Sequence, residues 1–236
     1  MCQIEGQLLL IEKHNLGSMV AWLLEHNQSQ AAPYHNLSHC MDVMYLAQHA
    51  YCYEEKGPYE KAICIAALFH DCNHSMGFYS DDNLNTYNAL EALKLARCQL
   101  KMNHTDKQED NMFFVVRRLI ENLQWPHEPL EEYSACINGR VCEKQYNIAA
   151  NCLRDADLFQ FCITTINSIV GIKKESFSQM TWDTFLMKHI AFMENIEYHS
   201  VWGKTHAHVK RDATVRHLQQ LRKLCYLSHE NIINSI

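Results

Sequence analysis

The sequence predicts an all-α fold. Only 7 of its 236 residues are Gly and 4 are Pro, whereas the helix-forming residues Leu, Ala, Glu, Gln and Met are plentiful. Apolar residues recur at helical spacing through most of the chain. A chain of this length that is 47% apolar can bury one substantial core, and no stretch has the composition of a linker between domains. We therefore expect residues 1–236 to form a single helical domain.

Three helices are expected in the first third of the chain. They span residues 4–27, about 36–55 and about 59–71. Pro33 stops the chain after the first helix, because proline lacks the amide hydrogen that a continuing helix needs. Gly57-Pro58 is typical of a turn and separates the second helix from the third. The third helix carries the apolar run Ile65 to Phe69 and delivers His70 and Asp71 at its end.

The remaining chain is expected to combine a polar loop with further helices. The stretch 73–85 is polar, which predicts a loop, and Asp81 or Asp82 is the expected cap of the next helix. A substrate contact by Asp82 or Asn85 is the alternative to this capping role. Four more helices are expected: one that follows the polar break 103–110 and ends before Pro126, and three over about 145–171, 178–197 and 205–228.

Charge and composition exclude several classes of protein. The formal net charge of -6 argues against a binder of nucleic acid without sequence preference, because such proteins carry a basic stripe. The basic residues that gather after Lys204 are better explained as the solvated face of a helix. No apolar run has the length of a membrane span, and Leu8 to Ile11 is too short for a signal peptide. The 11 Cys residues are irregularly spaced, which favours reduced thiols and a cytoplasmic protein. The sequence leaves the oligomeric state open.

Two pairs of histidines have the spacing of neighbouring side chains on a helix. His35 and His39 are four residues apart, and so are His70 and His74. One histidine of each pair can bind a metal while the other meets the substrate. His70 and Asp71 directly follow a buried apolar run, where unpaired polar groups are costly. A cation is the simplest partner for them.

The residues expected to bind this cation form a mixed set of ligands. It consists of His39, His70, Asp71 and Asp157. Two nitrogens and two carboxylates suit zinc, iron, manganese or magnesium. Asp155 is an alternative to Asp157, although on a helix it points to a different side.

These residues belong to three ordered motifs. The motifs read Tyr34-His35-Asn36-x-x-His39-x-x-Asp42-Val43, His70-Asp71-x-x-His74-x-x-Gly77 and Ala156-Asp157-Leu158. Over about 30–160, the pattern resembles the HD superfamily of metal-dependent phosphohydrolases. The residues of its motifs are similar to those in the catalytic domain of class I cyclic nucleotide phosphodiesterases. The resemblance implies an HD-type helical bundle with one or two divalent ions between helices, drawn from Mn, Fe, Zn, Mg and Ni. The Ala-Asp-Leu wording favours Asp157 over Asp155 as a ligand.

The resemblance also implies a role for each residue. The ligands of the first metal would be His39, His70, Asp71 and Asp157. Asp71 would bridge to a second metal and touch the nucleophilic water, and His35 would donate a proton to the leaving oxygen. His74 would lie beside the second metal or the substrate phosphate. His127, at the end of another helix, corresponds to a further histidine that faces the metals in many members.

The substrate implied by the resemblance is a small phosphate ester, namely a nucleotide-like phosphodiester such as a cyclic nucleotide. The alternatives are a nucleotide phosphomonoesterase or triphosphohydrolase, and a nucleotide-binding regulator without turnover. The C-terminal third has no clear match to the glutamine and phenylalanine that grip the purine in the cyclic nucleotide enzymes, so we expect loose base selectivity. The residues Trp182, Phe185, Phe192 and Trp202 are better explained as core than as a wall for a base.

Overall fold

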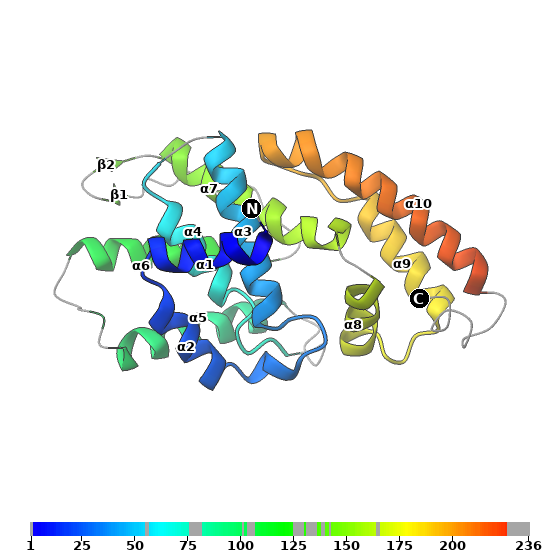
Figure 1. Cartoon of the computed structure of the whole chain (residues 1–236), viewed down its shortest axis with the longest axis horizontal. Helices are drawn as coiled ribbons and strands as arrows, with labels where there is room; N and C mark the ends of the chain where they lie inside the picture. Colours follow the sequence, from blue (N-terminus) through cyan, green and yellow to red (C-terminus); the bar gives the residue numbers. More distant parts are fainter. Residues whose placement is uncertain are drawn as a thin grey trace.

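The computed structural model describes residues 2–54, 57–75, 82–100, 102, 107–124, 130, 136–137, 140–141, 143–163 and 166–225. Within these ranges the chain is almost entirely helical, which confirms the predicted all-α class (Figure 1). The α-helices are α1 (Gln3–Lys13), α2 (Gly17–His26), α3 (Leu37–Glu54), α4 (Glu60–Phe69), α5 (Asp82–Gln99), α6 (Lys107–Glu121), α7 (Glu143–Ile163), α8 (Ile166–Ser176), α9 (Trp182–Glu194) and α10 (His208–Cys225).

Four short elements accompany these helices in the described ranges. A 3₁₀ turn, η1, covers Gln28–Ala31, and a π-helical turn, η2, covers Gly203–Ala207. The two-residue strands β1 (Cys136–Ile137) and β2 (Arg140–Val141) pair antiparallel. This small hairpin was not expected from the sequence, and it leaves the helical architecture unchanged.

Two of the expected helices are each divided into two. The segment 4–27 breaks at Asn15, whose φ of 54° lies in the left-handed region and ends α1. Asparagine tolerates this conformation better than most residues, because its short polar side chain bonds locally. The segment 145–171 is likewise divided, since α7 ends at Ile163 and α8 begins at Ile166 with a different direction (Figure 1).

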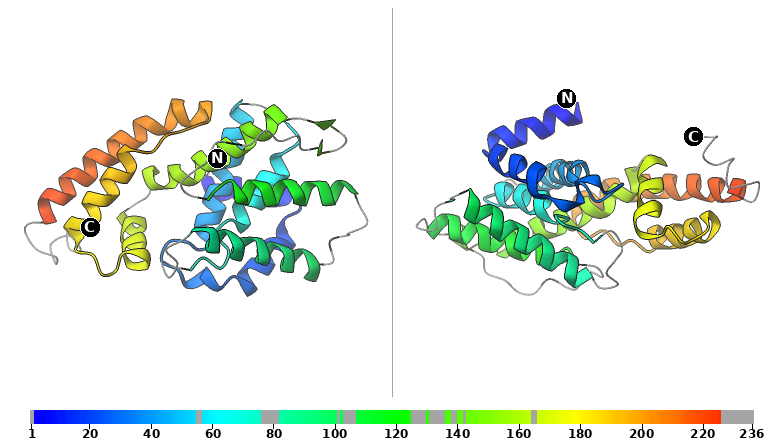
Figure 2. Two further views of the ribbon diagram at one scale, coloured as in Figure 1. Left: turned by 180° about the vertical axis from the view of Figure 1, so that it is seen from behind. Right: turned by 90° about the horizontal axis from the view of Figure 1, so that it is seen from below.

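The helix α3 lies at the centre of the fold and packs against both α4 and α7 (Figures 1 and 2). The helix α4 is buried on every side from Ala62 to Phe69. A helix that is apolar all round must be enclosed by other elements, which is why this short run occupies the core. The first motif lies at the start of α3 and the second follows the end of α4, so the packing of the two helices brings the motifs together.

The C-terminal helices form a separate packing pair. The helices α9 and α10 lie against each other, and α10 also contacts α7 (Figure 1). Trp182 and Phe185, near the start of α9, are buried, and Trp202 packs edge-on against Phe159 at 5.1 Å between ring centroids. These aromatic side chains therefore belong to the core, as their helical spacing suggested.

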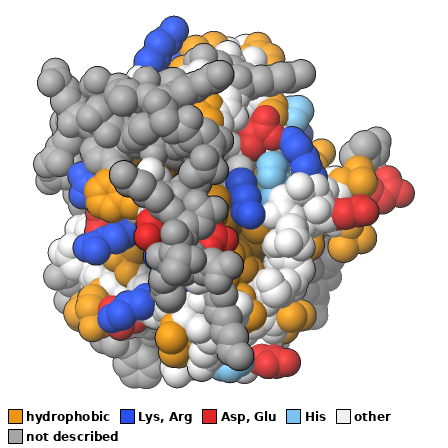
Figure 3. Space-filling view, turned by 90° about the vertical axis from the view of Figure 1, so that its left-hand side faces the viewer, with side chains coloured by type: hydrophobic (Ala, Val, Ile, Leu, Met, Phe, Trp, Pro, Cys, Tyr) orange, Lys and Arg blue, Asp and Glu red, His pale blue; other side chains and the backbone are white. Residues whose placement is uncertain are grey.

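Surface features agree with the limits set by composition. On the face drawn in Figure 3, Lys and Arg side chains are dispersed among acidic and apolar ones. Across the described ranges, no helix combines the length and the apolar run needed to cross a membrane. Cys40, Cys64, Cys72 and Cys152 are buried as free thiols.

Candidate metal centre

The first motif is placed by the cap of α3. The side-chain oxygen of Asn36 accepts hydrogen bonds from the amides of Ser38 at 2.9 Å and His39 at 3.3 Å. The Asn36 carbonyl accepts the first helical bond, from the amide of Cys40 at 3.2 Å. Asn36 is thus the N-cap, a position that favours asparagine because its side chain satisfies otherwise unpaired amides. The cap fixes His39 in the first turn of α3 and leaves His35 just outside it.

The second motif begins where α4 ends. The amide of His70 still donates to the carbonyl of Ala66 at 2.9 Å, so His70 is the C-cap of α4. Its ring Nδ1 lies 2.7 Å from the carbonyl of Ala67. Because a carbonyl only accepts, Nδ1 carries the hydrogen, and the Nε2 lone pair is left to bind something else.

Two imidazoles and two carboxylates converge between α3, α4 and α7. The Oδ2 atom of Asp71 lies 3.1 Å from Nε2 of His39 and 3.1 Å from Nε2 of His70. The Oδ1 atom of Asp157 lies 3.3 Å and 3.5 Å from the same two nitrogens. The structure therefore brings together the four residues predicted as ligands of the first metal.

The two histidine nitrogens provide the test of whether this group fits a metal ion. Both Nε2 atoms are buried, and neither makes a well-formed hydrogen bond to any residue that the structure describes. Buried polar atoms are rarely left in this state, because an unsatisfied group costs free energy. His39, His70 and Asp71 offer ligand atoms that all lie within 4.8 Å of one another, so this group can hold a metal ion. The residues present therefore fit a divalent ion of the kind that imidazole and carboxylate bind.

Strong electrostatic coupling accompanies this geometry. Burial alone would lower the pKa of His39, but contacts with Asp157 and Asp71 outweigh it and raise the pKa to about 10. Burial would also lower the pKa of His70, but the negative charge of Asp71, together with contacts to Asp157, raises this pKa well above its usual value. Burial disfavours the charged carboxylates, yet the histidines hold the pKa values of Asp71 and Asp157 well below the usual range. Without an ion, protons on the imidazoles thus balance the two carboxylates.

A residue that the sequence did not single out orients His35. Glu175, on α8, accepts hydrogen bonds through Oε2 from the amides of Tyr34 at 2.9 Å and His35 at 3.2 Å. Its Oε1 bonds Nδ1 of His35, and the Glu175 side chain is fully buried. Burial would raise the pKa of Glu175, but the bonds from His35 and His74 hold it well below the usual range. The carboxylate is therefore ionised and directs Nε2 of His35 away from α8.

His74 lies beside His35 and on the same carboxylate. Their rings stack with centroids 3.9 Å apart and an angle of 22° between planes. Nδ1 of His74 lies 3.6 Å from Oε1 of Glu175. His35, Asp71 and His74 form a second group whose ligand atoms can hold an ion. The two groups share Asp71, as expected for a carboxylate that bridges two sites.

The site is enclosed on one side and open on the other. The side chains of His39 and His70 are only 4% and 3% exposed. Asp157 and His35 are 25% and 18% exposed, so they form the solvent-facing rim. Solvent therefore reaches the cluster at the side chains of Asp157 and His35.

The other candidate residues have different positions. The side-chain oxygen of Asn85 accepts a hydrogen bond from the amide of Ser75 at 2.9 Å, so Asn85 anchors the second motif directly after His74. Asp82 is the first residue of α5, but its side chain and the whole of His127 lie outside the described residues. Asp155 points away from the cluster and accepts bonds from the amides of His199 and Ser200 at 3.0 Å and 2.8 Å.

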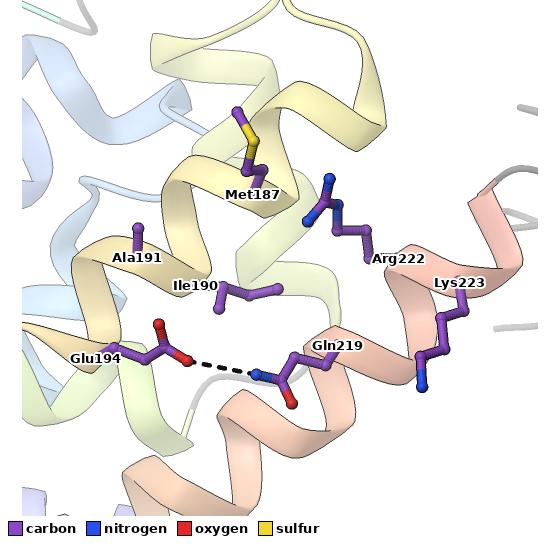
Figure 4. Close-up of a pocket in the computed structure, with 7 residues that line it drawn as sticks. All are labelled: Met187, Ile190, Ala191, Glu194, Gln219, Arg222 and Lys223. Carbon is purple, nitrogen blue, oxygen red and sulfur yellow. Dashed lines mark hydrogen bonds between the residues drawn. The ribbon is translucent and has the colours of Figure 1, made fainter.

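One pocket lies apart from this cluster, between α9 and α10 (Figure 4). It has a volume of about 520 Å³ and is lined by Met187, Ile190, Ala191, Glu194, Gln219, Arg222 and Lys223. Glu194 is bonded to Gln219 across it, and Arg222 is paired with Asp183 at 2.7 Å. None of its lining residues belongs to the metal-binding groups, and none is a histidine.

A scan against models of protein families and a search of curated proteins each found no match for this chain.

Proposed function

We propose that this chain is a metal-dependent phosphohydrolase of the HD type, acting on a nucleotide-like phosphodiester. The observation that carries the proposal is the convergence of two buried imidazole nitrogens, neither with a well-formed hydrogen bond, on two carboxylates beside a third imidazole. Structural histidines normally find hydrogen-bond partners, whereas metal ligands keep one nitrogen clear. A divalent ion held by His39, His70, Asp71 and Asp157 would lower the pKa of its water toward 7 and polarise the phosphate.

The chain's own groups would then handle the proton of the leaving group. Glu175 holds Nδ1 of His35, so Nε2 is the atom that would face the substrate. A diester releases an alkoxide, and an alkoxide needs a proton from a nearby acid as the bond to phosphorus breaks. The position of His35 supports this role, because His35 lies at the exposed rim beside His39 rather than with the two buried histidines.

Asp71 would have the central position in the site. Its Oδ2 contacts both buried imidazoles, and Asp71 also belongs to the second group with His35 and His74. A carboxylate accepts through either oxygen, so one oxygen can bind an ion while the other accepts the proton of an attacking water.

A second candidate function follows from the group of His35, Asp71 and His74. If Nε2 of His35 binds a second ion, it cannot also donate a proton. Such a site would favour a triphosphohydrolase, because a phosphate leaving group is stable as an anion and needs no proton. A regulator that binds nucleotides without turnover has no evident need for the bond between His35 and Glu175.

The proposal is tested by incubating the purified protein with manganese and a panel of cyclic, linear, monophosphorylated and triphosphorylated nucleotides. We expect cleavage of diesters, with activity lost in Asp71→Ala. Cleavage confined to triphosphates would favour the second candidate, and cleavage of none would reject both.

A further inference from the structure

The loop that carries His74 is held by a set of hydrogen bonds from a distant segment. Asn73 precedes His74 and has a φ of 59°, one of two described non-glycine residues in the left-handed region. Such backbone strain persists only where surrounding contacts maintain it, and it clusters at functional sites. The contacts here come from residues 27–29, which lie a few residues before the first motif.

Asn27 is the centre of these contacts. Its side chain is buried, with the residue 5% exposed. Its Oδ1 accepts from the amide of Asn73 at 2.9 Å and from the amide of Ser29 at 3.0 Å. Loss of this oxygen would leave two amides without their acceptor, one of them in the loop that carries His74.

Three more bonds fix the same two residues of the loop. The side-chain oxygen of Asn73 accepts from the amide of Gln28 at 2.8 Å, and its carbonyl accepts from Nδ2 of Asn88 at 3.1 Å. The hydroxyl of Ser29 donates to the carbonyl of His74 at 3.2 Å. Asn73 and His74 are therefore tied to η1 and to α5, whereas the His74 ring faces His35 and Glu175.

We propose that Asn27 and Asn73 are positioning residues that hold the His74 ring against His35, and so keep His35 and Glu175 in register for proton donation. This inference rests on the proposed function for the chemical role of His35. The positioning itself is a statement about geometry. A ring held 3.9 Å from its neighbour limits the rotation of that neighbour, and a shared carboxylate couples the two further.

The experiment compares Asn27→Ala with Asn27→Asp in the full-length, metal-loaded protein. The aspartate keeps an oxygen where Oδ1 of Asn27 accepts its two bonds, so it should restore what the alanine loses. The exposed residue Asn195, which bonds the carbonyl of Ala191 at 2.7 Å, supplies a matched control, Asn195→Ala. Thermal unfolding and elemental analysis would establish that each variant is folded and holds its metal.

Activity is measured on two phosphodiesters, one with an alkyl and one with a nitrophenyl leaving group. Residues that orient an active group typically cost about 10- to 100-fold when removed. We expect Asn27→Ala to lose about tenfold or more on the alkyl ester and clearly less on the nitrophenyl ester, which needs no proton. Asn27→Asp and Asn195→Ala should resemble the wild type. Equal losses on both esters would overturn the positioning role.

A second readout does not depend on activity. In the zinc-loaded protein, the ring signals of His35 and His74 can be assigned by NMR with His35→Gln and His74→Gln. We expect Asn27→Ala to shift these signals and to leave those of His39 and His70 in place. If the wild type cleaves neither ester, the proposed function fails and this readout alone decides the positioning role. Unchanged His35 and His74 signals would overturn it.

Discussion

At the scale of single residues, histidines with similar spacing in the sequence have different positions and partners in the site. His39 and His70 present nitrogens without a well-formed hydrogen bond to two carboxylates, whereas His35 is bonded to Glu175 and reaches the rim. The spacing of four residues between His35 and His39 could not distinguish these roles. The difference arises because Asn36 starts α3 between them and leaves His35 outside the helix.

Substitution of His35 should therefore differ from substitution of His39. His39→Ala should lose metal and activity together, whereas His35→Ala should keep the first metal. On a diester with a poor leaving group, loss of a general acid should cost about 100-fold or more. The loss should shrink on a nitrophenyl ester, and Glu175→Gln should show the same pattern with a smaller effect. Measuring the metal content of each variant together with its rates on the two esters checks this prediction. Loss of metal in His35→Ala would instead indicate that His35 is a ligand.

The residue scale also limits what the sequence could predict. The four candidate ligand residues were identified because polar groups followed a buried apolar run and the motifs had a recognisable order. Glu175 carried no such signal, since it lies 140 residues from His35 and follows two lysines at the end of a helix. Asn27 could not be identified from the sequence either. Its side chain accepts from the amides of Ser29 and Asn73, and the second of these contacts exists only because the fold brings η1 next to the loop that carries His74.

At the scale of elements, the helices follow the apolar spacing, and their ends follow local chemistry. The α4 run is buried throughout and ends at His70, as the sequence predicted. The break at Asn15 was missed because the apolar spacing continues across it. A positive φ at asparagine is a conformational choice that periodicity does not report.

The helix α9 contains a buried histidine that should make folding sensitive to acid. His189 stacks between Phe185 and Phe192 at 5.4 Å and 6.3 Å, and burial lowers its pKa to about 4. Below a pH of about 6.5, the unfolded chain takes up a proton that the folded chain refuses, so stability falls as the pH falls toward 4. This linkage amounts to about 2 kcal/mol at pH 5 as an upper estimate.

Urea unfolding of wild type and His189→Phe at pH 7 and pH 5 measures this contribution. The substitution removes the titrating group and keeps an aromatic ring between two others. We expect the wild type to lose more stability than the variant between the two pH values. An equal loss in both proteins would show that His189 does not cause the acid sensitivity.

At the scale of the whole molecule, the site is a meeting point of helices from distant parts of the chain. The candidate ligands come from α3, from the end of α4 and from α7, while α8 contributes Glu175. The fold class was predictable because composition and spacing extend over the whole chain. The position of Glu175 beside His35 was not predictable, because the change of direction from α7 to α8 has no simple sequence signal.

The same scale bears on substrate selectivity. Trp182 and Phe185 are packed in the core, with Lys173 over the Trp182 ring at 5.3 Å, so they do not offer a free face to a base. We expect the protein to cleave more than one cyclic or linear diester, with purine and pyrimidine forms differing by no more than about tenfold, near 1.4 kcal/mol in transition-state binding. Ratios of kcat/KM across the nucleotide panel measure this, and strict preference for one base would refute it.

The central claim is that His39, His70, Asp71 and Asp157 hold a metal ion, and elemental analysis tests it most directly. The wild type and Asp71→Ala are purified, loaded with manganese or zinc, freed of excess ion and analysed for metal per chain. The matched control is Asp212→Ala, which changes an exposed aspartate on α10. We predict at least one ion per chain in the wild type and in Asp212→Ala, and a large loss in Asp71→Ala, because Asp71 contacts both buried imidazoles. Absence of metal from all three proteins after loading, or equal metal in Asp71→Ala and wild type, would contradict the account.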